Sequence, residues 1–266
     1  DVVWESLDES AMPNLEGIVQ VNDFSVLVSR TEKLTYAREH LNELFGKKFP
    51  KNFRKEHINY YKDSPDELLV LNYTSGTTSF SKGVMIPARA LWSNMMFAFS
   101  ALTMKSGDRL VSMLPMAHMY GLAFEFLYPM ASGCHIFFLG KTPTPSVLIK
   151  ALGEVKPYML VTVPLVVEKI FKGKVMPTLE KPVMKVLTAI PGINKIIYNK
   201  VRTKLLTTFG GNLERGSLIV GGAAINEKVE KLMKKMNFPY TVGYGMTECA
   251  PLICYRNWKT FAMRSC

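Results

Sequence analysis

The chain has 266 residues, of which 48% are hydrophobic and 21% are charged, a composition typical of a globular protein with a sizeable core. Its formal net charge is +11, but the lysines are scattered and form no basic stripe with interleaved aromatic side chains, so nucleic acid is not indicated as a partner. The four cysteines, Cys134, Cys249, Cys254 and Cys266, form no CxxC pair, which argues against a zinc ribbon and favours free thiols in a reducing compartment.

Two features of the sequence bear on whether the chain spans a membrane or is secreted. Residues 114–140 contain no lysine or arginine, but Pro115, Glu125 and Pro129 interrupt them, so they do not predict a continuous spanning helix. The acidic N-terminus DVVWESLDES has no hydrophobic signal core. We therefore expect a cytoplasmic protein without a transmembrane segment, which could still contact a membrane peripherally.

Short apolar runs alternate with longer amphipathic ones along most of the chain. In the first half of the chain, the pattern predicts a helix at 35–44, a strand at 67–73, a helix at 88–104, a strand at 108–114, a helix at 120–131 and a strand at 134–140. A helix at 145–157, a strand at 158–164 and a helix at 164–173 that Gly173 ends follow, and then an irregular stretch at 174–193. The last predicted elements are a helix at 198–210, a strand at 217–224, a helix at 226–236 and a strand and loop at 240–248.

This alternation predicts an α/β fold with a mostly parallel sheet and helices on both faces. In such sheets, ligands bind at loops beyond the carboxyl ends of the strands. Residues 74–83, 221–224 and 243–248 follow predicted strands and have unusual chemistry.

Residues 73–83, YTSGTTSFSKG, are rich in hydroxyl groups and contain no carboxylate. Gly76 and Gly83 let the backbone turn its amides toward an anion, and Lys82 offers a positive charge. A P-loop does not fit, because Ser81 occupies the position of its second glycine. From composition alone, a phosphate loop and a solvent-exposed connection between strand and helix are equally good interpretations.

Four stretches together resemble the adenylate-forming acyl-CoA synthetase superfamily. YTSGTTSFSKG resembles its phosphate loop, and LPMAHMYGL, from Leu114, resembles its LPxxHxxG segment. IVGGAA, from Ile219, resembles its adenine-contacting segment, and VGYGMTECAP, from Val242, resembles its YGxTE motif. The runs VPLVVEKIF, NKVRTKLLTTFGGNL and VGGAAIN look most like the long-chain fatty acyl-CoA ligases.

The resemblance implies a reaction in two steps. A carboxylic acid attacks the α-phosphate of ATP and gives an acyl-adenylate, and the thiol of coenzyme A then displaces AMP. ATP, Mg²⁺, coenzyme A and a fatty acid are therefore the expected cofactors and partners. The donors expected to hold the β- and γ-phosphates are Thr74, Ser75, Gly76, Thr77, Thr78 and Lys82.

The same resemblance assigns roles to the other motifs. Glu248 is expected to bind Mg²⁺ through an oxygen, and Thr247 to hydrogen-bond the α-phosphate. His118 is expected at the mouth of the acyl pocket, although a core histidine bonded to backbone is the simpler alternative. The residues expected to line the adenine site are Tyr244, Gly222, Ala223 and Ala224.

The sequence also departs from the family pattern. A family glycine is replaced by Ser79 and a family proline by Ser81, but neither change removes a donor, so we expect phosphate binding to survive. The family's ribose-binding aspartate and its C-terminal domain, with the adenylation lysine, would lie beyond Cys266. We therefore interpret residues 1–266 as a partial N-terminal AMP-binding domain of an adenylate-forming enzyme, which should be inactive alone.

Two alternatives to a fatty-acid–CoA ligase stay open. One is the same superfamily acting on an aryl or amino acid, and the other is a catalytically inert nucleotide- or acyl-binding fragment. An amino-acid activator usually carries an acidic partner for the substrate ammonium. In MYGLAFEFLY the only candidate is Glu125, which helical spacing could turn toward or away from a pocket.

Overall fold

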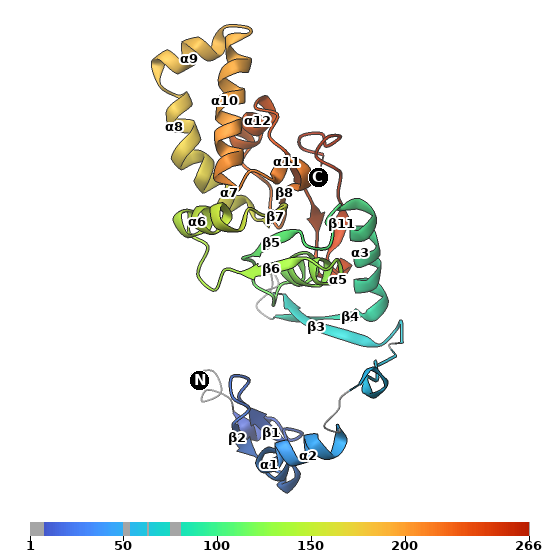
Figure 1. Cartoon of the computed structure of the whole chain (residues 1–266). Coiled ribbons are helices and arrows are strands. Elements are labelled where there is room, and N and C mark those ends of the chain that lie inside the picture. Colours follow the sequence, from blue (N-terminus) through green and yellow to red (C-terminus); the bar gives the residue numbers. More distant parts are fainter. Residues whose placement is uncertain (1–7, 50–53, 63, 75–80, 266) are drawn as a thin grey trace. The chain divides into compact units, whose positions relative to one another are not determined.

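The computed structural model describes residues 8–49, 54–62, 64–74 and 81–265, and the chain divides into two compact units, 1–62 and 63–266 (Figure 1). The smaller unit contains an antiparallel hairpin and two short helices. Its elements are η2 (Glu9–Ala11), β1 (Gly17–Val19), β2 (Val26–Ser29), α1 (Glu32–Glu39), α2 (Leu41–Lys48) and η3 (Lys55–His57). The hairpin was not predicted, and the helix predicted at 35–44 is two helices that meet at His40.

The larger unit combines parallel strands with antiparallel hairpins. Its strands are β3 (Leu68–Thr74), β4 (Lys82–Pro87), β5 (Arg109–Ser112), β6 (His135–Phe138), β7 (Met159–Thr162), β8 (Ser217–Val220), β9 (Tyr240–Val242), β10 (Tyr244–Gly245) and β11 (Leu252–Cys254). β5 pairs with β6, β7 with β8, and β8 with β9 in parallel, whereas β3–β4 and β10–β11 are antiparallel. β5 also contacts β7.

Helical elements follow or separate these strands. They are α3 (Ala88–Ala101), α4 (Met119–Gly121), η4 (Leu122–Leu127), α5 (Tyr128–Ala131), α6 (Pro145–Val155), α7 (Pro164–Ile170), η5 (Phe171–Val175), α8 (Met176–Leu179), α9 (Pro182–Ala189), α10 (Ile193–Thr208), α11 (Leu213–Gly216), α12 (Glu227–Lys235) and η6 (Thr247–Cys249).

β7 and β8 are buried on both faces, which explains their continuous apolar sequence. Leu160 and Leu218 pack into a cluster with α6, α7, α10 and α12. Their neighbours Val161 and Ile219 pack into a second cluster with α3, η4 and α5. The α/β class, with parallel strands covered by helices on both faces, is therefore confirmed (Figure 1).

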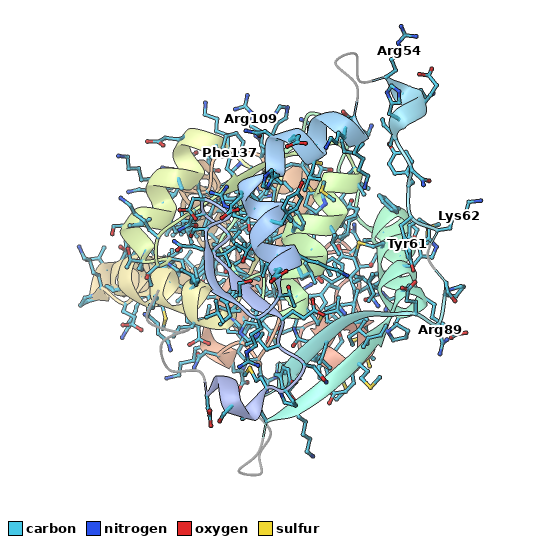
Figure 2. The ribbon with its side chains drawn as sticks, turned by 90° about the horizontal axis from the view of Figure 1, so that it is seen from below. Arg54, Tyr61, Lys62, Arg89, Arg109 and Phe137 are labelled. Carbon is cyan, nitrogen blue, oxygen red and sulfur yellow. The ribbon has the colours of Figure 1, made fainter. Side chains whose placement is uncertain are left out.

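The hydroxyl-rich loop is followed by a strand and not directly by a helix. β4 pairs with β3 along its whole length, from Leu68 opposite Pro87 to Thr74 opposite Lys82. At the far end of this hairpin, exposed Asp66 and Arg89 form an ion pair, and Figure 2 shows Arg89 at that position.

The predicted helix end at Gly173 is wrong. α7 continues through the π-helical turn η5 into α8, and α9 follows, so residues 174–193 are largely helical. Phe171 and Val175 are buried on either side of Gly173, and their packing offsets the roughly 1 kcal/mol that a helical glycine costs. Pro182 begins α9, a position where its missing N–H is not needed.

Candidate active site

A cavity of about 630 Å³ opens where the parallel strands end. Met113 and Leu114 follow β5, Val163 follows β7, Gly221 follows β8 and Gly243 follows β9, and all five line the cavity. The remaining lining residues come mainly from α3, α4, η4 and the β10–β11 region: Phe97, Leu102, Pro115, His118, Met119, Tyr120, Gly121, Phe124, Pro143, Val161, Val166, Ile219, Gly222, Tyr244, Gly245, Met246, Thr247, Pro251, Leu252 and Tyr255. The wall is mostly apolar and lies where α/β sheets bind ligands.

Three predicted motifs meet at this cavity. His118 of the LPMAH segment, Gly222 of the glycine turn, and Tyr244 and Thr247 of the YGMTE segment all line it. The other predicted residues of the last two motifs lie beside the lining without being part of it. They are the exposed residues Ala223, Ala224 and Glu248.

The phosphate loop is described only at its two ends. Thr74 ends β3 and lies opposite Lys82, which begins β4 and is exposed. The other predicted donors, Ser75, Gly76, Thr77 and Thr78, and the departure at Ser79 lie outside the described residues. β4 contacts η6, so the strand that Lys82 begins lies against the turn that carries Thr247.

Two glycines shape the cavity wall. Gly222 has a φ of +88°, a conformation that glycine adopts at no steric cost. A Cβ atom on Gly245 would collide with the carbonyl oxygen of Pro251 across the β10–β11 hairpin. These requirements explain why the VGGAA and YGMTE segments need glycine at these positions.

A buried asparagine fixes the turn that follows Glu248. The side-chain Nδ2 of Asn94, in α3, donates to the carbonyl of Cys249 at 2.9 Å, and its Oδ1 accepts from the amide of Leu252 at 2.9 Å. Asn94 is therefore a positioning residue that the sequence analysis missed. The available signal was a lone amide side chain in a mostly apolar helix.

The loop that carries His118 is anchored at both ends by buried polar side chains. Asn72, in β3, donates through Nδ2 to the carbonyl of Ala117 at 2.6 Å. Glu125, in η4, accepts through Oε2 from the amides of Met113 at 2.9 Å and Leu114 at 2.7 Å. The loop is therefore attached to the hairpin on one side and to the π-helical turn on the other.

Glu125 is fully buried and is not part of the cavity lining. Its Oε2 also accepts from the Ser112 hydroxyl at 3.2 Å, while its Oε1 has no hydrogen-bond partner among the described residues. Burial raises the pKa of the Glu125 carboxyl from 4.5 to about 7, although these three hydrogen bonds act in the opposite direction. Burial, and secondarily the charge of Glu125, raise the pKa of the Tyr120 hydroxyl.

The donor set suits magnesium held together with a nucleotide. Among the residues that the structure describes, no three His, Cys, Asp or Glu side chains gather into a cage of protein ligands. Mg²⁺ is usually bound through one or two carboxylates plus substrate phosphates. Glu248, exposed beside the cavity, fits that role.

Comparisons with known proteins agree with this geometry. The profile of a family described as AMP-binding enzyme matches residues 7–265. Long-chain-fatty-acid–CoA ligase 1 of Saccharomyces cerevisiae is 29% identical over 222 residues, which cover 73% of this chain and 30% of that protein. Long-chain-fatty-acid–CoA ligase 5 of Rattus norvegicus is 27% identical over 268 residues, which cover 92% of this chain and 37% of that protein. The chain thus spans about a third of the length of these relatives.

Solved structures share the fold of the chain. A malonyl-CoA ligase, in a ternary product complex with methylmalonyl-CoA and AMP, superposes with a TM-score of 0.52 at 24% identity, covering 76% of this chain and 37% of that one. Apo MatB from Rhodopseudomonas palustris superposes with a TM-score of 0.52 at 20% identity, covering 75% of this chain and 33% of that one. At these identities, the likeness shows the fold alone.

The raised pKa of Glu125 predicts a specific pH dependence of stability. Between pH 4.5 and about 7, the folded state keeps a proton that the unfolded state has lost, so stability falls as pH rises through this window. We expect the free energy of unfolding to fall by up to about 1.4 kcal/mol per pH unit relative to Glu125→Gln, which cannot titrate. Urea unfolding of both proteins across this range measures the difference.

Glu154→Gln, on the exposed face of α6, is the matched control and should keep the wild-type pH dependence. If the free energy of unfolding changed with pH in the same way for wild type and Glu125→Gln, the raised pKa of Glu125 would be contradicted.

Proposed function

Because this chain belongs to the family of AMP-binding enzymes, whose profile matches residues 7–265, we propose that it is part of a ligase that activates a long-chain fatty acid with ATP and transfers it to coenzyme A. One observation carries the proposal: His118, Gly222, Tyr244 and Thr247, from three separate motifs, line one mostly apolar cavity. The curated relatives named above are long-chain-fatty-acid–CoA ligases, which supports the same substrate class.

The nucleotide occupies the side of the cavity formed by the segments after β8 and β9. Gly222, Ala223, Ala224 and Tyr244 flank the adenine, because the small residues leave room for a planar base. The Thr247 hydroxyl donates to the α-phosphate. The β- and γ-phosphates lie against the loop between β3 and β4, on Thr74, Ser75, Gly76, Thr77, Thr78 and Lys82.

The acid occupies the apolar side. Phe97, Leu102, Phe124 and Val161 belong to a wall that suits an alkyl chain. His118, which lines the same cavity, would lie at the mouth of this side in the proposed function. The described lining contains no aspartate or glutamate, and the side chain of Glu125 is buried away from it. An amino acid would therefore have no carboxylate for its ammonium group there, which favours a fatty acid over an amino acid.

The chain's residues act mainly by position and charge. In the first step, an oxygen of the acid forms a bond to the α-phosphorus, and the bond to pyrophosphate breaks. Thr247 donates to the α-phosphate, and Lys82 offsets the charge of the departing pyrophosphate. Glu248 would hold Mg²⁺, which neutralises phosphate charge when bound. In the second step, the thiol of coenzyme A attacks the acyl carbonyl and AMP leaves.

Chain-length dependence of binding tests the substrate class. Palmitoyl sulfamoyl-adenosine, a stable analogue of an acyl-adenylate, should bind at least about tenfold more tightly than the acetyl analogue, because two buried methylenes already contribute about 1.6 kcal/mol. Calorimetry on this chain measures both affinities. A benzoyl analogue that binds more tightly than the palmitoyl one would favour an aryl acid, and equal affinities for all three would exclude an acyl pocket.

The charge of Lys82 should act on the outer phosphates. Lys82→Ala is expected to weaken ATP binding by roughly tenfold to a hundredfold, because one charge-assisted hydrogen bond is worth about 1.5 to 3 kcal/mol. AMP, which lacks those phosphates, should bind as before. Lys150→Ala, an exposed lysine of α6, is the control. Equal losses for ATP and AMP would remove Lys82 from the outer-phosphate site.

The carboxylate of Glu248 should make ATP binding depend on magnesium. In the unaltered chain, adding Mg²⁺ should tighten ATP binding, and in Glu248→Gln this gain should largely vanish, because a neutral amide is a poorer ligand for a hard dication. Titrations of ATP with and without Mg²⁺ measure the gain, and Glu154→Gln is the matched control. A gain that persists in Glu248→Gln would place the metal elsewhere.

A further inference from the structure

An apolar and basic surface lies far from the cavity, at the end of a helical projection. We call residues 181–196, which comprise α9 and the start of α10, the α9 tip. Figure 1 shows α9 at the end of the projection formed by α8 and α10, away from the parallel strands. None of its residues lines the cavity.

The α9 tip exposes a stripe of branched apolar side chains. Val183 and Val186 are 68% and 64% exposed, and Ile190, Ile193 and Ile196 are also exposed. Val183 and Val186 lie three residues apart on α9, Ile190 directly follows that helix, and Ile193 and Ile196 lie three residues apart at the start of α10.

The inner residues of α9 are apolar as well. Met184 and Leu187 are half-buried, and α9 packs against α10. The eight residues of α9 include one charge, Lys185. Val183 and Val186 therefore leave apolar surface exposed beside the side of α9 that already packs against the protein.

Lysines surround this stripe almost without acidic neighbours. Residues 172–200 contain six lysines and one carboxylate, Glu180. Lys181, Lys185 and Lys195 are exposed, and none forms an ion pair with any residue that the structure describes. Elsewhere, lysines such as Lys47 and Lys231 pair with a glutamate one helical turn away. The tip therefore combines apolar side chains with unneutralised positive charge.

We propose that the α9 tip docks onto the surface of a membrane that contains anionic lipids. Branched side chains of α9 enter the boundary between headgroups and acyl chains, and the flanking lysines contact lipid phosphates and carboxylates. A symmetric contact between two copies of this chain fits less well, because it would bring the two lysine clusters together. The proposal goes beyond the proposed function and does not depend on which acid is activated.

Binding to lipid vesicles tests the proposal without nucleotide or acid. This chain should sediment with vesicles of phosphatidylcholine mixed with phosphatidylserine, and more weakly with phosphatidylcholine alone. Lys181→Gln with Lys185→Gln should lower binding to the mixed vesicles by about tenfold or more, because each lysine near an anionic surface contributes about 1 kcal/mol. Val183→Gln, Val186→Gln and Ile196→Gln together should lower binding to both vesicle types.

Two control variants show whether weaker vesicle binding depends on the α9 tip or only on a lower net charge or less exposed apolar surface anywhere in the chain. Lys228→Gln with Lys235→Gln, on α12, changes the net charge equally, and Trp92→Gln with Met96→Gln removes two exposed apolar side chains from α3. Both controls should bind vesicles as the unaltered chain does. Glutamine is a good helix former, and thermal unfolding checks that each variant remains folded.

Three results would overturn the proposal. They are absence of vesicle binding by the unaltered chain, tip variants that bind as well as the controls, and a dimer in sedimentation equilibrium that the tip variants dissociate. The last result would identify a second copy as the partner of the tip.

Discussion

Burial of β7 and β8 on both faces is the constraint on which the rest of the structure depends. Side chains such as Leu160 and Val161 point into opposite cores, so helices on each side hold the strands in place. The parallel register sets Thr162 opposite Val220, and Val220 opposite Val242. The residues that directly follow these three strands therefore lie at the same edge of the sheet. They are Val163, Gly221 and Gly243, and all three line the cavity. Apolar packing thus assembles the cavity from segments that lie far apart in the sequence.

Buried polar side chains then fix the irregular segments around this edge. Asn72 and Glu125 hold the loop before His118, and Asn94 holds the turn after Glu248. In each case, the side chain bonds to backbone groups of these segments, and leaving such groups unpaired in the interior costs about 1 to 3 kcal/mol each. These residues contact neither phosphate nor acyl chain in the proposed function. They act by keeping the loops in one conformation, at the energetic cost of burying polar groups.

The parallel strands that end at the cavity were predictable because their sequence periods are clear. The apolar runs at β7 and β8 are strong local signals, and so is the amphipathic pattern of α12, whereas β11 beside the cavity was not predicted. β4 was missed because the hydroxyl-rich residues before it suggested an extended loop, and its pairing with β3 is a tertiary contact. The helix through Gly173 was missed because burial of Phe171 and Val175 outweighs the local preference of glycine. His118, Gly222, Tyr244 and Thr247 were predicted from motifs, whereas Asn94 and Asn72 act through contacts that no local pattern reveals.

In the proposed function, the segments after β8 and β9 form the nucleotide side of the cavity, with the acyl side against α3 and η4. A crystal structure of this chain bound to AMP would show where the nucleotide lies. We expect the adenine between the Gly222 turn and Tyr244, with the phosphate within hydrogen-bonding distance of the Thr247 hydroxyl. An AMP molecule bound outside this cavity, or bound in it with its phosphate directed toward Phe124 and Val161, would rule out this placement.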